Sequence, residues 1–472
     1  MSLRPSTSDR NIGPASAVRW LGAVAALAVL AVLFSFPAPG PRAVELPAGI
    51  VELHRELLVP GSTELRAAAA GTVLRAAADF DGRALVVVYG EKVTLRGFTL
   101  DGNREELEQR TGLPPTDKPF SQFTRGNGVL AVGVRKLRIE NLRFRNIAGF
   151  AVLVSRSRDV GIENVEVADS GSHDTRGRNN TTGGILLEEG TRDFSVIRSE
   201  FRNIRGNGVW THSLFTSPRN RDGWIAFNRF QDLARDAIQV GHATNVRVED
   251  NRGTRIGYPA ELVDLESQAY PVAIDTAGDV DHSSYARNRF TEVDGKCIDL
   301  DGFHDGDVVE NSCVNRPDGS LYPFGNVGIL FNDSNPHTRS NRIRVVGNVL
   351  DGVKYTGIYA FGTGHTIAHN RLLNVNLAHC NEEAAKSGCY YPKDEPDALQ
   401  SGIYLGRGFL WREPARDNVV EDNEISGFGM KSRCIGFAPG VGAGANTIRN
   451  YRCRYEGAHS VGILRYENYR FS

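Results

Sequence analysis

The sequence has almost no excess of charge of either sign. Lys and Arg number 55 against 56 Asp and Glu, which leaves a formal net charge of −1. A strongly basic domain is absent, so we predict no nucleic-acid partner. Only 2 methionines and 6 cysteines occur, with no C-x-x-C pair. The scarcity of methionine argues against a helical protein, and the missing C-x-x-C spacing excludes a zinc ribbon. Walker, Rossmann and H-E-x-x-H motifs are also missing.

Long hydrophobic runs are missing except for one near the N-terminus. Residues 20–36 carry no charge, and residues 1–19 before them contain Arg4, Arg10 and Arg19. This pattern predicts a cytoplasmic N-terminal region, an exported remainder and a segment 20–36 that is either a signal peptide or a transmembrane anchor. A Pro-rich linker follows at 37–44. We expect a periplasmic or cell-surface protein, held at the membrane by residues 20–36 or secreted.

Export would place the cysteines in an oxidising compartment, where cysteines pair. Cys380 and Cys389 share one polar insertion, and we predict a disulfide between them. The further pairs considered are Cys297 with Cys313 and Cys434 with Cys453.

From about residue 92 onward the sequence repeats a two-part pattern. An apolar pair followed by Asn, as in IENVEV (162–167), alternates with a strand-like phrase such as CIDLDGFH (297–304). Several of these Asn residues recur at a spacing just above 20 residues. Such a period, built from short alternating segments and corners, predicts a solenoid. We therefore predict one all-β domain over residues 45–472, a parallel β-helix of about 11–12 coils.

The recurrent Asn has a structural interpretation. A short corner between strands needs a left-handed backbone, which Asn tolerates better than most residues. Stacked coils would bring the Asn amides into register, so that each can hydrogen-bond the next. We therefore assign these Asn residues to the corners and not to ligand binding.

The repeats resemble the right-handed parallel β-helix superfamily of pectate lyases and polygalacturonases, over roughly residues 45–472. The segment KVTLRGFTLDGN (92–103) is similar to the N-terminal part of that superfamily. Polygalacturonase-like enzymes carry Asn-Thr-Asp and Asp-Asp on successive coils. Here 274–276 (Ile-Asp-Thr) and 299–301 (Asp-Leu-Asp) occupy similar places. The resemblance implies carbohydrate chemistry, but the family's Gly-His-Gly and Arg-x-Lys motifs are missing, so it does not imply galacturonan as substrate.

Aligning the strands on their inward Ile or Val predicts outward columns of side chains. Neighbouring coils lie about 4.8 Å apart, so Asp275 and Asp299 should be neighbours, with Asp301 beside them on a solvent-facing wall. Insertions precede several of these strands, and solenoid insertions tend to gather on one face. We therefore expect this wall to form the floor of a groove.

Acids on such a wall suit the cleavage of a glycosidic bond, which needs one acid and one base or nucleophile. Stacked carboxylates repel, which raises one pKa and keeps that group protonated. We predict catalytic roles for Asp275, Asp299, Asp301 and the nearby His304, and leave retaining and inverting geometries open. The predicted substrate-binding residues are Trp210, His212, Gln239, His242, Asn332, Asp333, Tyr359, Tyr404 and Arg407.

The main functional prediction is an exported glycoside hydrolase acting on a polysaccharide or oligosaccharide. A lyase or C5-epimerase is the second, with His212 or His304 as base and Arg407 as charge neutraliser. A non-catalytic glycan-binding or envelope scaffold is the third. We predict no cofactor or metal, with Ca²⁺ as the alternative because clustered carboxylates bind it. The calcium ligands would be Asp299, Asp301, Asp305 and Asp307.

Overall fold

The computed structural model describes residues 42–108, 117–172, 182–259, 262–263, 270–315, 327–336, 338–378, 380, 395–428 and 434–456. The chain separates into two units, residues 1–40 and 41–472, and all described residues belong to the second. The predicted signal or anchor segment 20–36 therefore lies outside the described residues. Within the described part, no helix combines the length and the apolar character that a membrane crossing requires.

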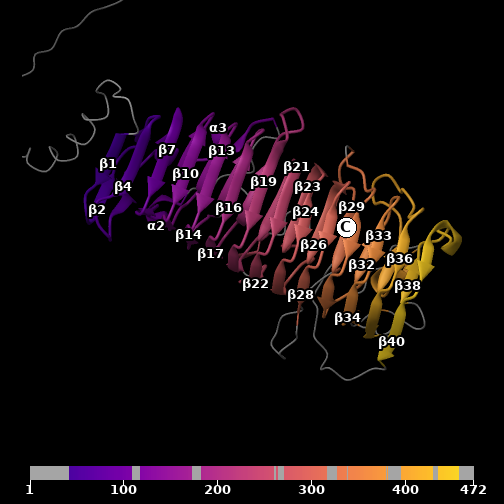
Figure 1. Ribbon diagram of the computed structural model, residues 1–472. Helices are drawn as coiled ribbons and strands as arrows, with labels where there is room; N and C mark the ends of the chain where they lie inside the picture. Colours follow the sequence, from indigo (N-terminus) through magenta and orange to yellow (C-terminus); the bar gives the residue numbers. More distant parts are fainter. Residues whose placement is uncertain are drawn as a thin grey trace, which may run out of the picture. The chain divides into compact units, whose positions relative to one another are not determined.

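Almost all regular structure is parallel strand, arranged in three ladders that run along the stack (Figure 1). Each strand pairs with the equivalent strand of the coil before it and the coil after it. The first ladder contains β3 (Leu57–Val59), β6 (Ala84–Val88), β9 (Asn127–Val132), β12 (Phe150–Ser155), β15 (Gly183–Glu188), β18 (Asn207–His212), β21 (Ile238–Glu249), β23 (Ile274–Asp281), β26 (Ile298–His304), β29 (Ile329–Asn332), β32 (Ile358–Ala360), β35 (Ile403–Leu405) and β38 (Ile435–Phe437).

The second ladder follows the first around each coil and joins it through the long strand β21. It contains β1 (Arg42–Leu46), β4 (Thr63–Ala67), β7 (Glu91–Arg96), β10 (Arg135–Glu140), β13 (Arg158–Glu163), β16 (Arg192–Ile197), β19 (Asn220–Ala226), β24 (Ser284–Ala286), β27 (Asp307–Val309), β30 (Arg344–Val346), β33 (Thr366–Ala368), β36 (Val419–Glu421) and β39 (Thr447–Arg449).

The third ladder closes the coil and has 14 strands. It contains β2 (Ile50–Leu53), β5 (Val73–Ala76), β8 (Thr99–Asp101), β11 (Arg143–Arg145), β14 (Glu166–Ala168), β17 (Glu200–Ile204), β20 (Arg229–Leu233), β22 (Arg252–Ile256), β25 (Arg289–Val293), β28 (Ser312–Val314), β31 (Val349–Asp351), β34 (Arg371–Val375), β37 (Glu424–Phe428) and β40 (Arg452–Glu456).

The stack is longer than the sequence predicted. The third ladder has 14 strands, one from each coil, so the number of coils exceeds the expected 11–12. The additional coils come from residues 42–101, which form β1–β8 without the repeated Asn phrase. Their corners use other left-handed residues, among them Ser62 and Lys92.

Helical structure in the described part is confined to short pieces: α2 (Arg104–Leu107), α3 (Phe120–Phe123), η4 (Pro396–Leu399) and η5 (Ala443–Ala445). The first three lie where the chain passes from the third ladder back to the first. The insertion between β22 and β23 occupies the same passage. The predicted gathering of insertions at one corner of the coil is therefore confirmed for these three coils.

Apolar side chains from all three ladders fill the interior. On the third ladder, Phe201 and Phe230 stack with ring centroids 5.0 Å apart. The next inward position is Gly253, where an added Cβ would come within 2.6 Å of Phe290. Burying each such ring contributes roughly 1.5–3 kcal/mol, so the aromatic column is a main source of cohesion between coils.

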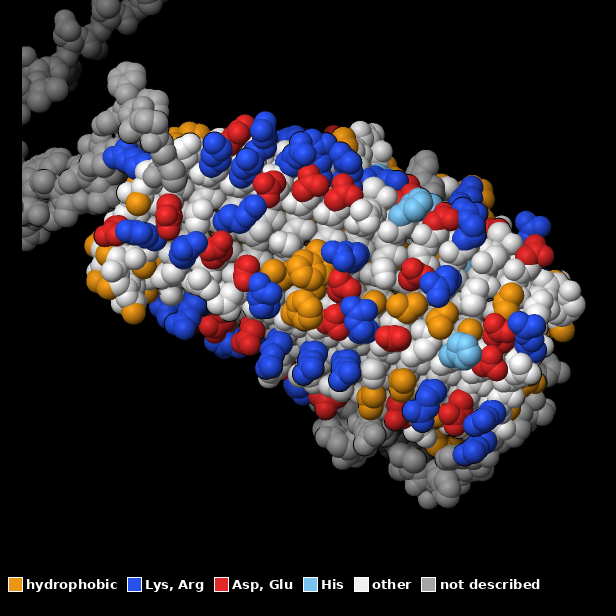
Figure 2. Space-filling model, viewed as in Figure 1, with side chains coloured by type: hydrophobic (Ala, Val, Ile, Leu, Met, Phe, Trp, Pro, Cys, Tyr) orange, Lys and Arg blue, Asp and Glu red, His pale blue; other side chains and the backbone are white. Residues whose placement is uncertain are grey.

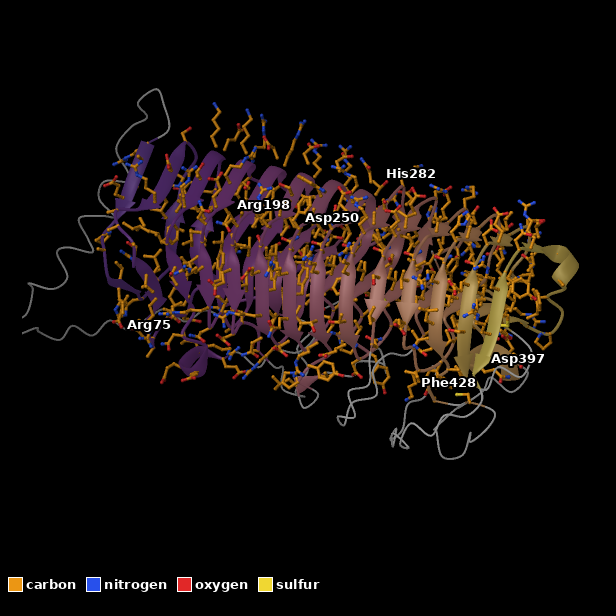
Figure 3. The ribbon with its side chains drawn as sticks, turned by 60° about the horizontal axis from the view of Figure 1, so that its bottom comes forward. Arg75, Arg198, Asp250, His282, Asp397 and Phe428 are labelled. Atoms are coloured by element: carbon orange, nitrogen blue, oxygen red, sulfur yellow. A yellow bond between two sulfur atoms is a disulfide. The ribbon has the colours of Figure 1, made fainter. Side chains whose placement is uncertain are left out.

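The Asn residues occupy two different corner positions, which corrects the sequence alignment. Asn141 and Asn164 are themselves left-handed, with φ of 55° and 51°. In later coils the left-handed position passes to another residue, such as Phe227 or Asp250, and the buried Asn follows it. Figure 3 shows Arg198 and Asp250, two members of this left-handed row, along the stack. The buried Asn residues form the predicted amide ladder, in which each side-chain amide donates to the next at 2.9–3.1 Å: Asn228, Asn251, Asn288, Asn311, Asn348, Asn370 and Asn423.

Both of the cysteine pairs that the sequence left as alternatives form disulfides. Cys297 pairs with Cys313 across 16 residues, and Cys434 pairs with Cys453 across 19 residues. Each bond closes about one coil. The predicted pair includes Cys389, which lies outside the described residues.

Candidate functional site

The first outward column forms in the predicted register. Trp210 pairs with Gln239, Gln239 with Asp275, and Asp275 with Asp299 on β18, β21, β23 and β26. Asp301 lies two residues further along β26 and pairs with Ala277. The structure therefore brings together the three predicted catalytic aspartates. It also places Asn332 beside Asp301 on the next strand.

The three aspartates are more enclosed than the predicted solvent-facing wall. Asp299 is only 5% exposed, whereas Asp275 and Asp301 are half-buried. The reason is that residues from the strand starts and from a loop close over them. Asp236 precedes β21, Lys296 precedes β26, and Ser334 follows β29. We call Asp236, Asp275, Asp299 and Asp301 the aspartate cluster.

Asp275 has a strongly raised pKa. Burial raises its pKa well above the usual value, and the carboxylates of Asp236 and Asp299 raise it further. Gln239 donates from Nε2 to Asp275 Oδ2 at 2.6 Å, and Asn207 in turn fixes Gln239 at 2.9 Å. Asp275 is therefore positioned, and its raised pKa favours the protonated form that a general acid requires.

Lys296 compensates the charge of Asp299. Its ammonium group donates to Asp299 Oδ2 at 2.7 Å. Burial alone would lower the pKa of Lys296, but the neighbouring carboxylates, Asp299 first, hold it above its usual value. The other carboxylate oxygen, Asp299 Oδ1, is buried and accepts no hydrogen bond from any described residue.

The pKa of Asp301 is raised less far and falls close to neutrality. Burial, and then the charge of Asp299, raise its pKa to about 6. Ser334 opposes this shift, because its backbone N–H donates to Asp301 Oδ1 at 2.9 Å and its hydroxyl donates to Oδ2. The pKa of Asp301 therefore lies close to neutrality, where a carboxylate can accept a proton.

Sequence alignment missed two members of the site, Asp236 and Lys296. Asp236 is buried, and its pKa is raised by burial, with Arg235 opposing the shift. Its Oδ1 accepts the backbone N–H of Val272 at 2.7 Å. Both residues stand two positions before the inward Ile of their strand, at the corner and outside the period-2 pattern. Extending the alignment by those two positions would have placed them in one column.

Three predicted substrate-binding residues are instead buried supports. Tyr359 is 3% exposed and Tyr404 is fully covered. The Tyr359 ring stacks on Phe409, and the Tyr404 hydroxyl donates to Glu395 at 3.0 Å. Asp333 is also buried and accepts the backbone N–H groups of residues 409–411 at 2.6–3.1 Å. The segments 395–400 and 408–413 cover this part of the column, which the strand pattern could not indicate.

Arg407 and His304 are not joined to the aspartate cluster. Arg407 follows β35, three coils beyond β26. The imidazole of His304 contacts Asp279 Oδ1 at 2.9 Å through Nε2 and Asp305 Oδ2 at 2.7 Å through Nδ1. These contacts, that with Asp279 first, raise the pKa of His304. His304 therefore belongs to a corner network and not to the predicted catalytic group.

The four acids considered for calcium are divided between two places. Asp305 pairs with Arg342 at 2.8 Å and Asp307 with Arg344 at 2.8 Å. Asp299 and Asp301 remain in the aspartate cluster, where Lys296 and Ser334 hold them. The four carboxylates therefore do not converge as the calcium alternative required.

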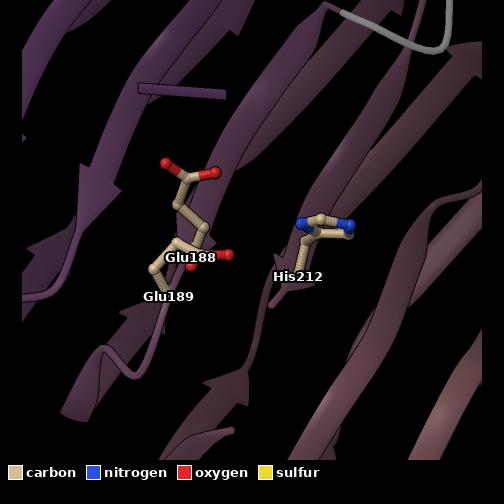
Figure 4. A group of neighbouring side chains, drawn as sticks. All are labelled: Glu188, Glu189 and His212. Atoms are coloured by element: carbon tan, nitrogen blue, oxygen red, sulfur yellow. The ribbon is translucent and has the colours of Figure 1, made fainter. Parts of the chain in front are cut away.

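A second group of polar residues lies on earlier coils, where Glu188, Glu189 and His212 have ligand atoms within 4.8 Å of one another. Figure 4 shows His212 on β18, next to β15, which ends at Glu188 and is followed directly by Glu189. Each Glu already accepts backbone N–H groups: Glu188 from residues 120 and 121, and Glu189 from Leu214. The group therefore anchors neighbouring loops. A divalent cation would have to compete with those hydrogen bonds.

The predicted substrate-binding residues on these coils, one Trp and two His, differ in how exposed they are. Trp210 is half-buried and packs edge-on against Phe120 at 5.0 Å and His212 at 5.2 Å. Burial, and then the charge of His242, lower the pKa of His212 to about 4. His242 is buried at a corner and packs against Phe215 at 4.6 Å. Trp210 therefore keeps a partly open face next to Gln239, whereas His242 does not face the wall.

Comparisons with known proteins agree with this architecture. Residues 84–271 match the model of the right-handed beta helix region. A comparison with curated protein sequences gives no match.

Three solved structures illustrate the structural likeness. The surface adhesin PfbA of Streptococcus pneumoniae is similar at 14% identity and a TM-score of 0.52, over 72% of this chain and 85% of that one. DFA-IIIase of Arthrobacter chlorophenolicus A6, in complex with GF2, gives 14% and 0.50, over 74% and 88%. GH136 lacto-N-biosidase of Eubacterium ramulus gives 13% and 0.50, over 87% and 68%. With the parallel register of the strands, these matches identify the chain as a right-handed parallel β-helix protein.

Proposed function

We propose that this protein hydrolyses a glycosidic bond of a carbohydrate outside the cytoplasm, with Asp275 as general acid and Asp301 as general base. The leaving-group oxygen takes the proton of Asp275, and Asp301 takes a proton from the attacking water. Glycoside hydrolysis requires such a pair, one protonated and one ionised. Asp299 lies between them, and after burial its Coulomb interaction contributes to the raised pKa of both neighbours.

The separation of the pair favours inversion of configuration. Asp275 and Asp301 are offset by one coil and two residues along the strand. With coils about 4.8 Å apart and about 3.3 Å per residue, the offset is roughly 8 Å. Inverting enzymes place their carboxyl groups ~6.5–9.5 Å apart, which leaves room for water. Asp299 would be closer to Asp275, but it is buried and salt-bridged to Lys296.

One observation carries the proposal: the buried Asp299 Oδ1 lacks a hydrogen-bond donor among the described residues, between two acids whose pKa values are raised. A buried acceptor without a donor costs about 1–3 kcal/mol. A buried group that bears such a cost beside two acids with raised pKa values is typical of a functional site. Gln239 and the partly open Trp210 continue the same column and add a polar and a flat apolar contact.

The comparisons support a carbohydrate but do not specify which one. DFA-IIIase and GH136 lacto-N-biosidase share the fold. PfbA, a surface adhesin, shares it as well. The predicted export segment supports a site of action outside the cytoplasm.

The test is a set of single Asp→Asn variants assayed on a panel of neutral and acidic glycans. We expect Asp275→Asn and Asp301→Asn each to lower kcat/KM by at least about 100-fold, in line with the usual contribution of general acid–base catalysis. Asp81→Asn is the matched control, because Asp81 is an exposed acid that pairs with Arg125 on an early coil and belongs neither to the aspartate cluster nor to its supports. NMR of the first product should show the inverted anomer.

Two results would reject the proposed function. The first is full activity in Asp275→Asn, and the second is a parent protein that binds glycans without turnover. A product that absorbs in the ultraviolet would instead indicate an unsaturated sugar and hence the lyase alternative.

A further inference from the structure

A second feature of the surface lies on the corner between the first and second ladders, away from the aspartate cluster. A groove of about 540 Å³ crosses four coils there, and six arginines line it: Arg135, Arg156, Arg158, Arg192, Arg219 and Arg221. Figure 2 shows Lys and Arg side chains gathered along the upper edge of the molecule, above β10–β19. Glu189 is the one acidic side chain in the lining.

Four of these arginines form a ladder of like charge. Arg135 pairs in register with Arg158, Arg158 with Arg192, and Arg192 with Arg221. Neighbouring guanidinium groups are thus attached to strands about 4.8 Å apart. Like charges directly opposite one another destabilise a sheet. Elsewhere on this protein, register neighbours often carry opposite charges, as Arg143 and Glu166 do at 3.4 Å.

The arginines of the groove are only partly neutralised, although Arg219 pairs with Asp279 at 3.1 Å and with Asp281 at 3.0 Å. Arg135, Arg158 and Arg221 each contact one exposed carboxylate, at 3.3, 3.0 and 3.5 Å. Exposed ion pairs of this kind contribute little and exchange readily with other anions. Arg156 and Arg192 have no carboxylate partner among the described residues. The single acid of the lining, Glu189, is buried and already accepts the Leu214 N–H and the Ser217 hydroxyl.

We propose that this arginine groove binds an anionic polysaccharide, a polymer that carries carboxylate or sulfate groups. Guanidinium groups bind such oxyanions with paired, charge-assisted hydrogen bonds. A ladder with a spacing of about 4.8 Å offers one cation per coil to successive anions of an extended chain. Ser157 and Ser217 add hydroxyl groups suited to sugars.

The lining argues against other polyanions. It contains no aromatic side chain, and single-stranded nucleic acids are usually held by aromatic stacking. Its apolar residues are limited to Val134 and Pro218, whereas membrane-surface binding needs a larger apolar face. The groove shares no residue with the aspartate cluster, so it can hold a polymer independently of the chemistry proposed there.

The experiment measures binding of the full chain to polygalacturonate, dextran sulfate and uncharged dextran. All proteins carry Asp275→Asn, so that turnover does not remove the ligand. We expect one or both anionic polymers to bind, with affinity falling between about 50 and 300 mM salt as charges are screened. Arg156→Ala with Arg192→Ala should weaken binding by at least about tenfold, because the variant loses two sets of charge-assisted hydrogen-bond donors.

The matched control removes two arginines of the same kind from another surface. Arg229 and Arg252 are exposed register neighbours on the third ladder, without a carboxylate partner among the described residues. Arg229→Ala with Arg252→Ala should leave binding within about twofold, and unchanged melting temperatures would verify that both variants fold. Equal losses in both pairs, equal binding of uncharged dextran, no binding of either anionic polymer, or equal competition by duplex DNA would each overturn the proposal. The arginine double variant is also made with Asp275 intact. If it loses binding of the anionic polymer but keeps hydrolysis, the groove is separate from the proposed active site.

Discussion

At the scale of single residues, the aspartate cluster is a group of enclosed acids whose raised pKa values are opposed by two cations, Arg235 and Lys296. Lys296 donates to Asp299 at 2.7 Å, and its charge also opposes the rise in the pKa of Asp275. The cluster keeps three other acids close to that pair. Such an arrangement is costly in a protein interior and is expected where function requires shifted pKa values.

Replacing Lys296 should therefore destabilise the fold and not only affect activity. We expect Lys296→Met to lower the free energy of unfolding by about 3–5 kcal/mol, because it leaves the Asp299 carboxylate buried without a partner. The double variant Lys296→Met with Asp299→Leu should recover most of the loss. Urea unfolding of the three proteins measures this. A single variant as stable as the parent would show that water compensates the Asp299 charge.

His304 gives a pH-dependent prediction. Its pKa is raised by its contacts with Asp279 and Asp305, so the contribution of its charge is complete below the ordinary value of about 6.5 and is lost as pH rises through the raised pKa. His304→Asn should therefore cost about 1–2 kcal/mol near pH 5.5 and much less near pH 9. Thermal unfolding at both pH values tests this. An equal loss at both would mean that the imidazole contributes packing and not charge.

At the scale of strands and corners, the period-2 pattern predicted the register of the acid column correctly. Each inward Ile fixed the direction of its neighbour, so Asp275 and Asp299 could be paired from sequence. Side chains outside that pattern could not be placed. Lys296 comes from a corner, and Tyr404 is covered through Glu395, a residue that follows a long insertion. The alternation of apolar and polar residues predicts the direction of side chains on a strand. It does not predict which corner and loop residues cover that strand.

The corner Asn residues give a test of the difference between the buried amide ladder and the exposed left-handed positions. Asn288 is buried, accepts from Asn251 and donates to Val248 and Asn311. Asn288→Ala should cost about 2–4 kcal/mol, since it leaves several backbone and side-chain groups buried without partners. Asn164→Gly is the control, because Asn164 is exposed at a left-handed corner and its amide donates to the equally exposed Asn141 side chain and not to buried groups. We expect the control to cost less than about 1 kcal/mol. Similar losses in urea unfolding would contradict the distinction between the two corner positions.

At the scale of the whole molecule, the coils form one stack in which each coil contacts mainly its neighbours. Stability in such a solenoid is approximately a sum of local and nearest-neighbour contributions. A coil near an end has fewer neighbours than one in the middle. The two disulfides sample both situations, since Cys297–Cys313 lies among coils on either side and Cys434–Cys453 joins strands of the last described coils.

The disulfides also connect the fold to the predicted export of the chain. Loops of 16 and 19 residues correspond to about 3 kcal/mol each in the chain-entropy estimate, and such bonds persist only in oxidising compartments. We expect Cys434→Ser with Cys453→Ser to increase proteolytic cleavage of the last coils. Cys297→Ser with Cys313→Ser should lower the melting temperature while its coil stays protected by the coils on both sides. Limited proteolysis followed by mass spectrometry distinguishes the two. Early cleavage near Cys297 would show that the middle of the stack depends on its disulfide as much as the end does, and that nearest-neighbour packing does not protect it.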